Sequence, residues 1–145
     1  MIVTEEQKKQ IIEEQNEWNH YCDKTLEIRR EGDMFFTPPH LIFDMIEQID
    51  DNVDKENYKV LDPTCGSGNL LAALAICGYN PKNLYGNEYD KDLVELARTR
   101  LEKLGVPKTN IHQGDALDVR YIQPKSFNPD KLKADVVEYE KEELW

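Results

Sequence analysis

Cysteines and long hydrophobic runs are both scarce in this sequence. Its 145 residues include three cysteines, Cys22, Cys65 and Cys77, and no two of them form a CxxC pair. An odd, scattered set predicts reduced thiols in a cytoplasmic protein, without a disulfide scaffold or a structural zinc site. No apolar run approaches the ~20 residues of a membrane helix, and residues 1–6 lack the basic and apolar regions of a secretory signal. We therefore expect no bound metal and no membrane partner.

Basic side chains are outnumbered, and the formal net charge is -11. The excess of acid is concentrated in residues 1–57, which hold 15 acidic and 6 basic side chains, whereas residues 58–119 hold 8 and 7. A chain of this charge does not have the positively charged surface that binding to nucleic-acid phosphates requires. DNA stays open as a partner, but the charge of this chain does not favour it.

Two helices are predicted ahead of the first strand. Thr4 and Gln7 form a capping box, and residues 5–25 are expected to form an amphipathic helix whose charged remainder is a solvated face. Thr37 is predicted to cap a second helix that has prolines in its first turn. The buried stripe of the first helix is expected at Ile11, Gln15, Trp18 and Cys22, and that of the second at Leu41, Ile42, Met45, Ile46 and Ile49.

From residue 58 onward, strand and helix patterns alternate. Strands are predicted at residues 58–62, 83–88 and 110–115, with a buried helix over residues 69–77 and another helix capped by Asp90 between them. Such alternation implies an α/β fold whose open sheet is parallel and has right-handed crossovers.

The C-terminal part carries a weaker signal, with a candidate fourth strand at residues 134–139. A sheet of this size would leave exposed edges and uncovered apolar surface, which natural proteins pair or cover. We expect the C-terminal segment, the N-terminal helix or a second copy of the chain to cover an edge, which makes a homodimer a candidate assembly.

A glycine turn and three acidic residues fall where open α/β sheets bind ligands. The first strand ends at Asp62 and runs into the turn DPTCGSGN at residues 62–69, whose glycines let the backbone approach a ligand closely. Glu88 and Asp115 end the next two strands, so three carboxylates are expected at one edge of the sheet. These residues predict a nucleoside pocket in which Glu88 accepts hydrogen bonds from the ribose hydroxyls. They do not distinguish a nucleoside ligand from a dinucleotide. Cys65 has no histidine neighbour in the sequence and is expected to be a small buried filler.

The segments DPTCGSGN, YGNEYD and HQGDAL, in this order and spacing, resemble motifs I, II and III of class I S-adenosylmethionine-dependent methyltransferases. The first is similar to motif I of amino-methyltransferases, especially the adenine-N6 DNA methyltransferases of restriction–modification systems. The upstream sequence FFTPP at residues 35–39 resembles their motif X, and its position ahead of motif I is the gamma-type order. The resemblance covers residues 33–119. It implies a Rossmann-like sheet with flanking helices, truncated relative to the seven strands of a full methyltransferase, and S-adenosylmethionine as the cofactor.

The resemblance divides the chain into an acidic helical extension, residues 1–32, and a cofactor-binding domain, residues 33–145. It also implies a role for each motif position. Residues 36–38 would border the methionine moiety, and residues 62–69 would face the amino acid part of the cofactor. Glu88 would hold the ribose, while Tyr89 and Asp115 would contact the adenine. The full set of implied cofactor-binding residues is Phe36, Thr37, Pro38, Asp62, Pro63, Thr64, Cys65, Gly66, Gly68, Asn69, Glu88, Tyr89, Asp115, Ala116 and Leu117.

The catalytic motif IV of that family, Asp/Asn-Pro-Pro-Tyr/Phe, does not occur in these residues. Asn128, followed by Pro129, matches only its first half and is the candidate catalytic residue. Four functions stay open: an adenine-N6 DNA methyltransferase, a non-catalytic cofactor-binding subunit or regulator, an acidic inhibitor of nucleic-acid enzymes, and a small-molecule methyltransferase. The acidic inhibitor would use Glu13, Glu14 and Glu17. The subunit would need a partner chain that supplies the missing part, and S-adenosylhomocysteine is expected to bind as S-adenosylmethionine does.

Overall fold

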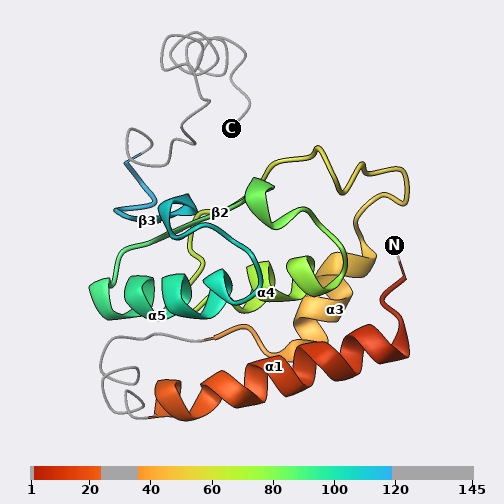
Figure 1. Cartoon of the computed structure of the whole chain (residues 1–145), viewed down its shortest axis with the longest axis horizontal. Coiled ribbons are helices and arrows are strands. Elements are labelled where there is room, and N and C mark those ends of the chain that lie inside the picture. The colour runs from red at the N-terminus through yellow and green to blue at the C-terminus, as the bar shows by residue number, and fades with distance from the viewer. Residues whose placement is uncertain (1, 24–35, 119–145) are drawn as a thin grey trace, which may run out of the picture.

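A three-stranded parallel sheet forms one layer of the protein (Figure 1). The computed structural model describes residues 2–23 and 36–118. The strands are β1 (Val60–Asp62), β2 (Leu84–Glu88) and β3 (Ile111–Gln113), and β2 lies between the other two. The predicted α/β class and the three parallel strands are confirmed, although each strand is shorter than predicted.

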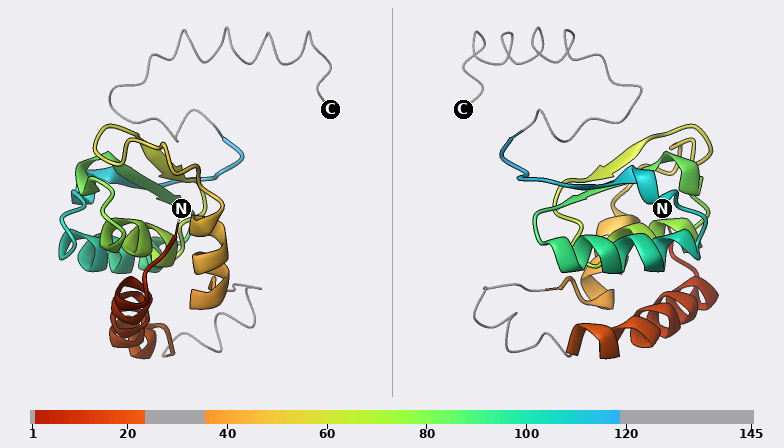
Figure 2. Two further views of the ribbon diagram at one scale, coloured as in Figure 1. Left: turned by 90° about the vertical axis from the view of Figure 1, so that its right-hand side faces the viewer. Right: turned by 60° about the vertical axis from the view of Figure 1, so that its left-hand side comes forward.

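Helices cover one face of this sheet in two further layers (Figure 2). The first layer holds α4 (Asn69–Ile76) and α5 (Lys91–Glu102), which lie directly against the strands. Below them runs α1 (Glu5–Asp23), which packs on α4 and on α3 (Pro39–Glu47). Short 3₁₀ turns, η1 (Pro81–Asn83) and η2 (Lys108–Asn110), lead into β2 and β3.

The core lies between the sheet and its helices. Leu71 of α4, Leu101 of α5 and Leu84 of β2 are each 0% exposed, and Ile42 and Ile46 of α3 join the same cluster. Each fully buried side chain of this size contributes about 1.5–3 kcal/mol of hydrophobic stabilisation. The predicted buried helix over residues 69–77 is confirmed as α4, and α5 supplies the other helical wall of this core.

The N-terminal helix follows its predicted pattern over residues 5–19 with one exception, whereas the side chain of Cys22 and the predicted helix end at residue 25 lie outside what the structure describes. Its capping box is reciprocal, because the Thr4 amide donates to Gln7 Oε1 (3.0 Å) and the Gln7 amide donates to Thr4 Oγ1 (3.1 Å). Ile11 and Trp18 are buried on the predicted stripe. The prediction that the charged side of this helix is a solvated face is wrong at Glu14, whose side chain is largely buried and paired with Arg100 of α5.

Two predictions about α3 are corrected by the structure. Its N-cap residue is Pro38 and not Thr37, and no side chain caps this helix. A proline carbonyl can accept the first helical hydrogen bond, and Ile42 N donates to Pro38 O at 3.2 Å. The predicted stripe is also too wide, because Leu41 and Met45 are 46% and 48% exposed.

The other face of the sheet carries Leu61 and Tyr85, which are register partners on β1 and β2. Leu61 is 41% exposed, and no helix within the described residues covers this face. The predicted strand at residues 134–139 and the predicted domain boundary at residue 32 lie outside the described residues. None of the helices in residues 2–23 and 36–118 combines the length and the apolar character that crossing a bilayer requires.

Gly68 joins the glycine turn to the helix behind it. Its φ is +93°, and a Cβ built there would lie 2.9 Å from Leu101 Cδ1, so the turn lies almost in contact with α5. The position is both left-handed and crowded, which only glycine tolerates without a shift of its neighbours.

Replacing Gly68 by alanine should therefore destabilise the fold more than replacing Gly78. Gly78 has a similar φ of +95°, but its Cβ would meet only Lys55, at 3.9 Å. Both variants carry the left-handed penalty of about 1–2 kcal/mol. Gly68→Ala alone adds overpacking of about 1–3 kcal/mol. Urea unfolding of the two variants measures the difference, and equal losses would contradict the close contact with Leu101.

Candidate functional site

The three acidic residues lie at or just beyond the carboxyl ends of the strands and share one hydrogen-bonding pattern. In each, a carboxylate oxygen accepts from the backbone amide two residues further on. Asp62 Oδ1 accepts from Thr64 N (3.1 Å), Glu88 Oε2 from Asp90 N (2.7 Å) and Asp115 Oδ1 from Leu117 N (2.9 Å). The second oxygen of each carboxylate makes no hydrogen bond or ion pair within the described residues, so it is available to a ligand.

The environment of Asp62 raises the pKa of its carboxyl group. Burial raises its pKa, the hydrogen bond from the Thr64 amide opposes that rise, and the negative charge of Glu88 adds to it. None of the described basic side chains forms an ion pair with Asp62. Within the described residues, the negative charge at this site therefore has no basic partner on Asp62, and a bound cation would favour the ionised carboxylate.

The glycine turn meets the segment that precedes α3. The ring of Phe36 lies 3.5 Å from where a Cβ of Gly66 would be, so it covers the turn. Asn69 Nδ2 donates to the Thr37 carbonyl at 3.1 Å. Two segments that the sequence separates by about 30 positions thus form one wall of the site, as the resemblance to motifs X and I implies.

Asn87 ties the three strand ends together. Its Nδ2 donates to the carbonyls of Pro63 (3.1 Å) and Gly114 (3.0 Å), and its own backbone carbonyl accepts from Cys65 N (2.8 Å). The side chain is 0% exposed, and its Oδ1 has no hydrogen-bond partner within the described residues. A buried polar atom of this kind requires a donor, which a ligand or a water molecule can provide.

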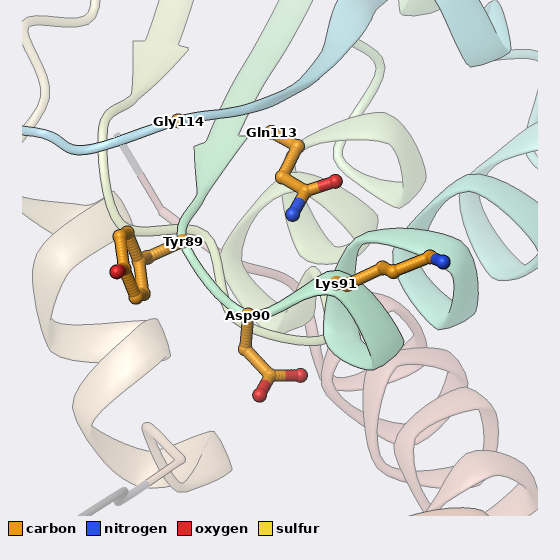
Figure 3. A pocket seen from close by; sticks show the side chains of 5 residues that line it. All are labelled: Tyr89, Asp90, Lys91, Gln113 and Gly114. Atoms are coloured by element: carbon orange, nitrogen blue, oxygen red, sulfur yellow. The ribbon is translucent and has the colours of Figure 1, made fainter.

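A hollow of about 440 Å³ opens beside these strand ends (Figure 3). It is lined by Tyr89, Asp90 and Lys91 after β2 and by Gln113 and Gly114 at the end of β3. Tyr89 is 75% exposed, so its aromatic ring is accessible for stacking on a flat heterocycle.

The remaining predicted site residues differ in their surroundings. Asn69 is buried, and both ends of its amide bond to protein atoms, so it supports the turn from behind. Ala116 is half-buried and Leu117 is 91% exposed, next to Asp115. Pro63 and Thr64 are exposed on the turn, and Pro38 is half-buried at the start of α3. Asn128 lies outside the described residues.

Cys65 does not have the surroundings of a nucleophile. It is 6% exposed, and burial raises the pKa of its thiol, with a further rise from the carboxylates of Asp62 and Glu88. A neutral buried thiol is a poor nucleophile. The prediction that Cys65 is a small buried filler is confirmed. Across the described residues, no cluster of three or more histidine, cysteine and acidic side chains could hold a metal ion.

Sequence reasoning missed three residues that shape the site, namely Ser67, Asn87 and Arg100. Arg100 is 2% exposed and donates to Ser67 O (3.3 Å) and Asn69 Oδ1 (2.6 Å). The sequence does contain a signal for Arg100 and Asn87. Arg100 lies seven positions after Leu93 on the apolar stripe of α5, and Asn87 interrupts a buried strand. A polar residue at a core position indicates a buried hydrogen-bond network.

This chain belongs to the methyltransferase-domain family, because the family model described as "Methyltransferase domain" matches residues 54–137. The match spans the three strands and the glycine turn, and it confirms the family that the motifs indicated.

One relative is the type II methyltransferase M.VspI of Vibrio sp. (strain 343). It is 33% identical over 93 residues, which cover 63% of this chain and 22% of the relative. The chain therefore spans only about a fifth of that protein's length. No solved structure gives a significant match.

Replacing Asp62 by asparagine should stabilise the ligand-free protein. Because burial raises the pKa of Asp62, its charged form weakens the fold as the pH rises through that pKa. Asparagine keeps the acceptor for Thr64 N and removes the charge. The midpoint of thermal unfolding should rise by a few degrees at neutral pH, and the gain should vanish in acid below the usual carboxyl range. A variant that melts lower than the parent at neutral pH would contradict the raised pKa.

Proposed function

We propose that this domain binds S-adenosylmethionine at the carboxyl edge of its sheet and presents the cofactor for transfer of a methyl group to an amine. The observation that carries the proposal is the carboxylate of Asp62, which pairs with no basic side chain among the described residues and is set beside Glu88 and the glycine turn. S-adenosylmethionine supplies a sulfonium methyl, which is the electrophile of the reaction, and it carries positive charge at its sulfur and at its amino group. That charge suits this site.

The chemistry of the site favours this cofactor over a dinucleotide. A dinucleotide would bring a pyrophosphate to the glycine turn, and the negative charges of Asp62 and Glu88 would repel it. The free oxygen of Glu88 suits a ribose diol, because a carboxylate accepts from both hydroxyls. The hollow beside Tyr89 and Gly114 suits the adenine, and the free oxygen of Asp115 can accept from its exocyclic amine.

The Phe36 ring and the buried amide of Asn87 complete the fit. Phe36 over Gly66 offers an apolar wall that excludes water from the methionine part of the ligand. The orphaned Oδ1 of Asn87 offers an acceptor for a water molecule or a ligand donor at the base of the site. These groups orient and shield the cofactor, and no proton transfer is required of them.

The finer part of the proposal is that the acceptor is an adenine amine of DNA. Its support is the DPxCGSG form of motif I, the motif order and the type II methyltransferase among the relatives. With a net charge of -11, the basic surface that grips the DNA phosphates must come from other residues of the complete enzyme, on this polypeptide or on another.

A second candidate function is a cofactor-binding subunit that relies on another chain for catalysis. The observation that favours it is the lack of an Asp/Asn-Pro-Pro-aromatic sequence among these 145 residues. In this case, the chain would contribute the cofactor pocket, and the residues that accept the amine protons would come from the partner.

Calorimetric titration with S-adenosylmethionine tests the proposed pocket. The parent protein should bind one equivalent, and Glu88→Gln should weaken binding about tenfold because it loses a charged acceptor for the ribose. Glu102→Gln, an exposed change at the far end of α5, provides the matched control and should bind as the parent does. Asp62→Asn should bind more weakly although it melts higher. Absence of binding to the parent at millimolar ligand would refute the pocket.

Transfer of labelled methyl groups to adenine-containing duplex DNA separates the two candidate functions. If these residues form a complete enzyme, the chain should label DNA without a partner protein, and mass spectrometry should find the label on adenine N6. A subunit should bind the cofactor without labelling DNA by itself. Label on cytosine, or on small amines only, would contradict the adenine acceptor.

A further inference from the structure

Arg100 connects the N-terminal helix to the glycine turn through a buried network. Its Nε and Nη2 donate to the two carboxylate oxygens of Glu14, the second at 2.7 Å. Its Nη1 donates to Ser67 O (3.3 Å), Ser67 Oγ (3.4 Å) and Asn69 Oδ1 (2.6 Å). The guanidinium thus uses one edge for α1 and the other for the last residues of the turn.

The network continues from the glycine turn to the segment that precedes α3. Asn69 accepts from Arg100 with Oδ1 and donates to the Thr37 carbonyl with Nδ2, so its amide is held at both ends. Glu14 and Arg100 are 86 positions apart in the sequence, and Asn69 and Thr37 are 32 apart. Four remote segments are therefore linked by side-chain hydrogen bonds, and two of these segments, the glycine turn and the chain before α3, form the wall of the candidate site.

Burial makes this link depend on Glu14. The Arg100 side chain is 1% exposed and that of Glu14 is 13% exposed, so each charge relies on the other for compensation. A buried guanidinium that loses its carboxylate must find another acceptor or move toward water. Either movement withdraws Nη1 from Ser67 and Asn69, and the turn then loses the donor that fixes it.

We propose that Glu14 and Arg100 are positioning residues for the cofactor turn, so that docking of α1 sets the geometry and the affinity of the pocket. The effect on cofactor affinity rests on the proposed function, whereas the effect on the geometry of the turn does not. By reciprocity of coupling, a cofactor that orders the turn also strengthens the docking of α1.

Hydrogen exchange of the ligand-free protein tests the turn directly. The amides of Cys65 and Gly68 are hydrogen-bonded in the turn, to Asn87 O and Cys65 O, both at 2.8 Å. In Glu14→Gln, their exchange should accelerate about tenfold, while the amides of β2 keep their rates. Glu13→Gln makes the same charge change at an exposed neighbour on α1 and should leave both sets unchanged.

Three outcomes decide the matter. Faster exchange confined to the turn, together with about tenfold weaker S-adenosylmethionine binding, supports the proposal. Unchanged turn exchange in a folded Glu14→Gln protein overturns it. Equal acceleration of amide exchange in the turn and in β2 also overturns it, because that result would mean that Glu14 only stabilises the whole fold.

Conservative variants, together with binding data on the parent protein, distinguish a failure of this proposal from a failure of folding or of the proposed function. Should Glu14→Gln fail to fold, Glu14→Asp replaces it with the same readings, because it keeps the charge and shortens the reach to Arg100. Arg100→Lys should loosen the turn as well, since an ammonium cannot bridge Glu14 and Asn69 as a planar fork does. If the parent does not bind S-adenosylmethionine, the proposed function fails, and the exchange of the turn still decides the role of Glu14.

Discussion

The buried amide of Asn87 is the constraint on which the candidate site depends. It donates to the carbonyls of Pro63 and Gly114, on the loops that leave β1 and β3, while its own strand lies between them. A buried amide without such partners would cost about 1–3 kcal/mol, so these hydrogen bonds hold the loops in place. Asp62 directly precedes Pro63 and Asp115 directly follows Gly114, so the same amide holds the backbone next to both carboxylates.

The electrostatics of the site follow from this geometry. Parallel strands bring their carboxyl ends to one edge, and here each end carries an acid that accepts a hydrogen bond from its own loop. The second oxygen of each acid has no partner in the part of the chain that the structure describes. None of the basic side chains in residues 2–23 and 36–118 pairs with Asp62, and burial together with the charge of Glu88 disfavours its ionised form. A positive charge close to this carboxylate would favour the ionised form, whereas a negative charge would disfavour it further. The family and the physical chemistry of the site therefore point to the same ligand class.

Much of the fold could be read from the sequence because its signals are local. The apolar run of α4, the Asp90 cap of α5 and the period of the strands report interactions within a few residues, and the structure agrees with them. The signals that failed are tertiary. Nothing near Glu14 in the sequence shows that its partner lies 86 positions away, and the exposure of Leu41 depends on which side of α3 the neighbouring helices leave open.

The central claim is that the ends of β1, β2 and β3 enclose an adenosyl ligand, and a crystal structure with S-adenosylhomocysteine tests it most directly. The account predicts the adenine in the hollow beside Tyr89 and Gly114, the ribose on Glu88 and the amino acid end at the glycine turn. Density for the ligand elsewhere on the molecule, or none between these strand ends at saturating concentration, would contradict it.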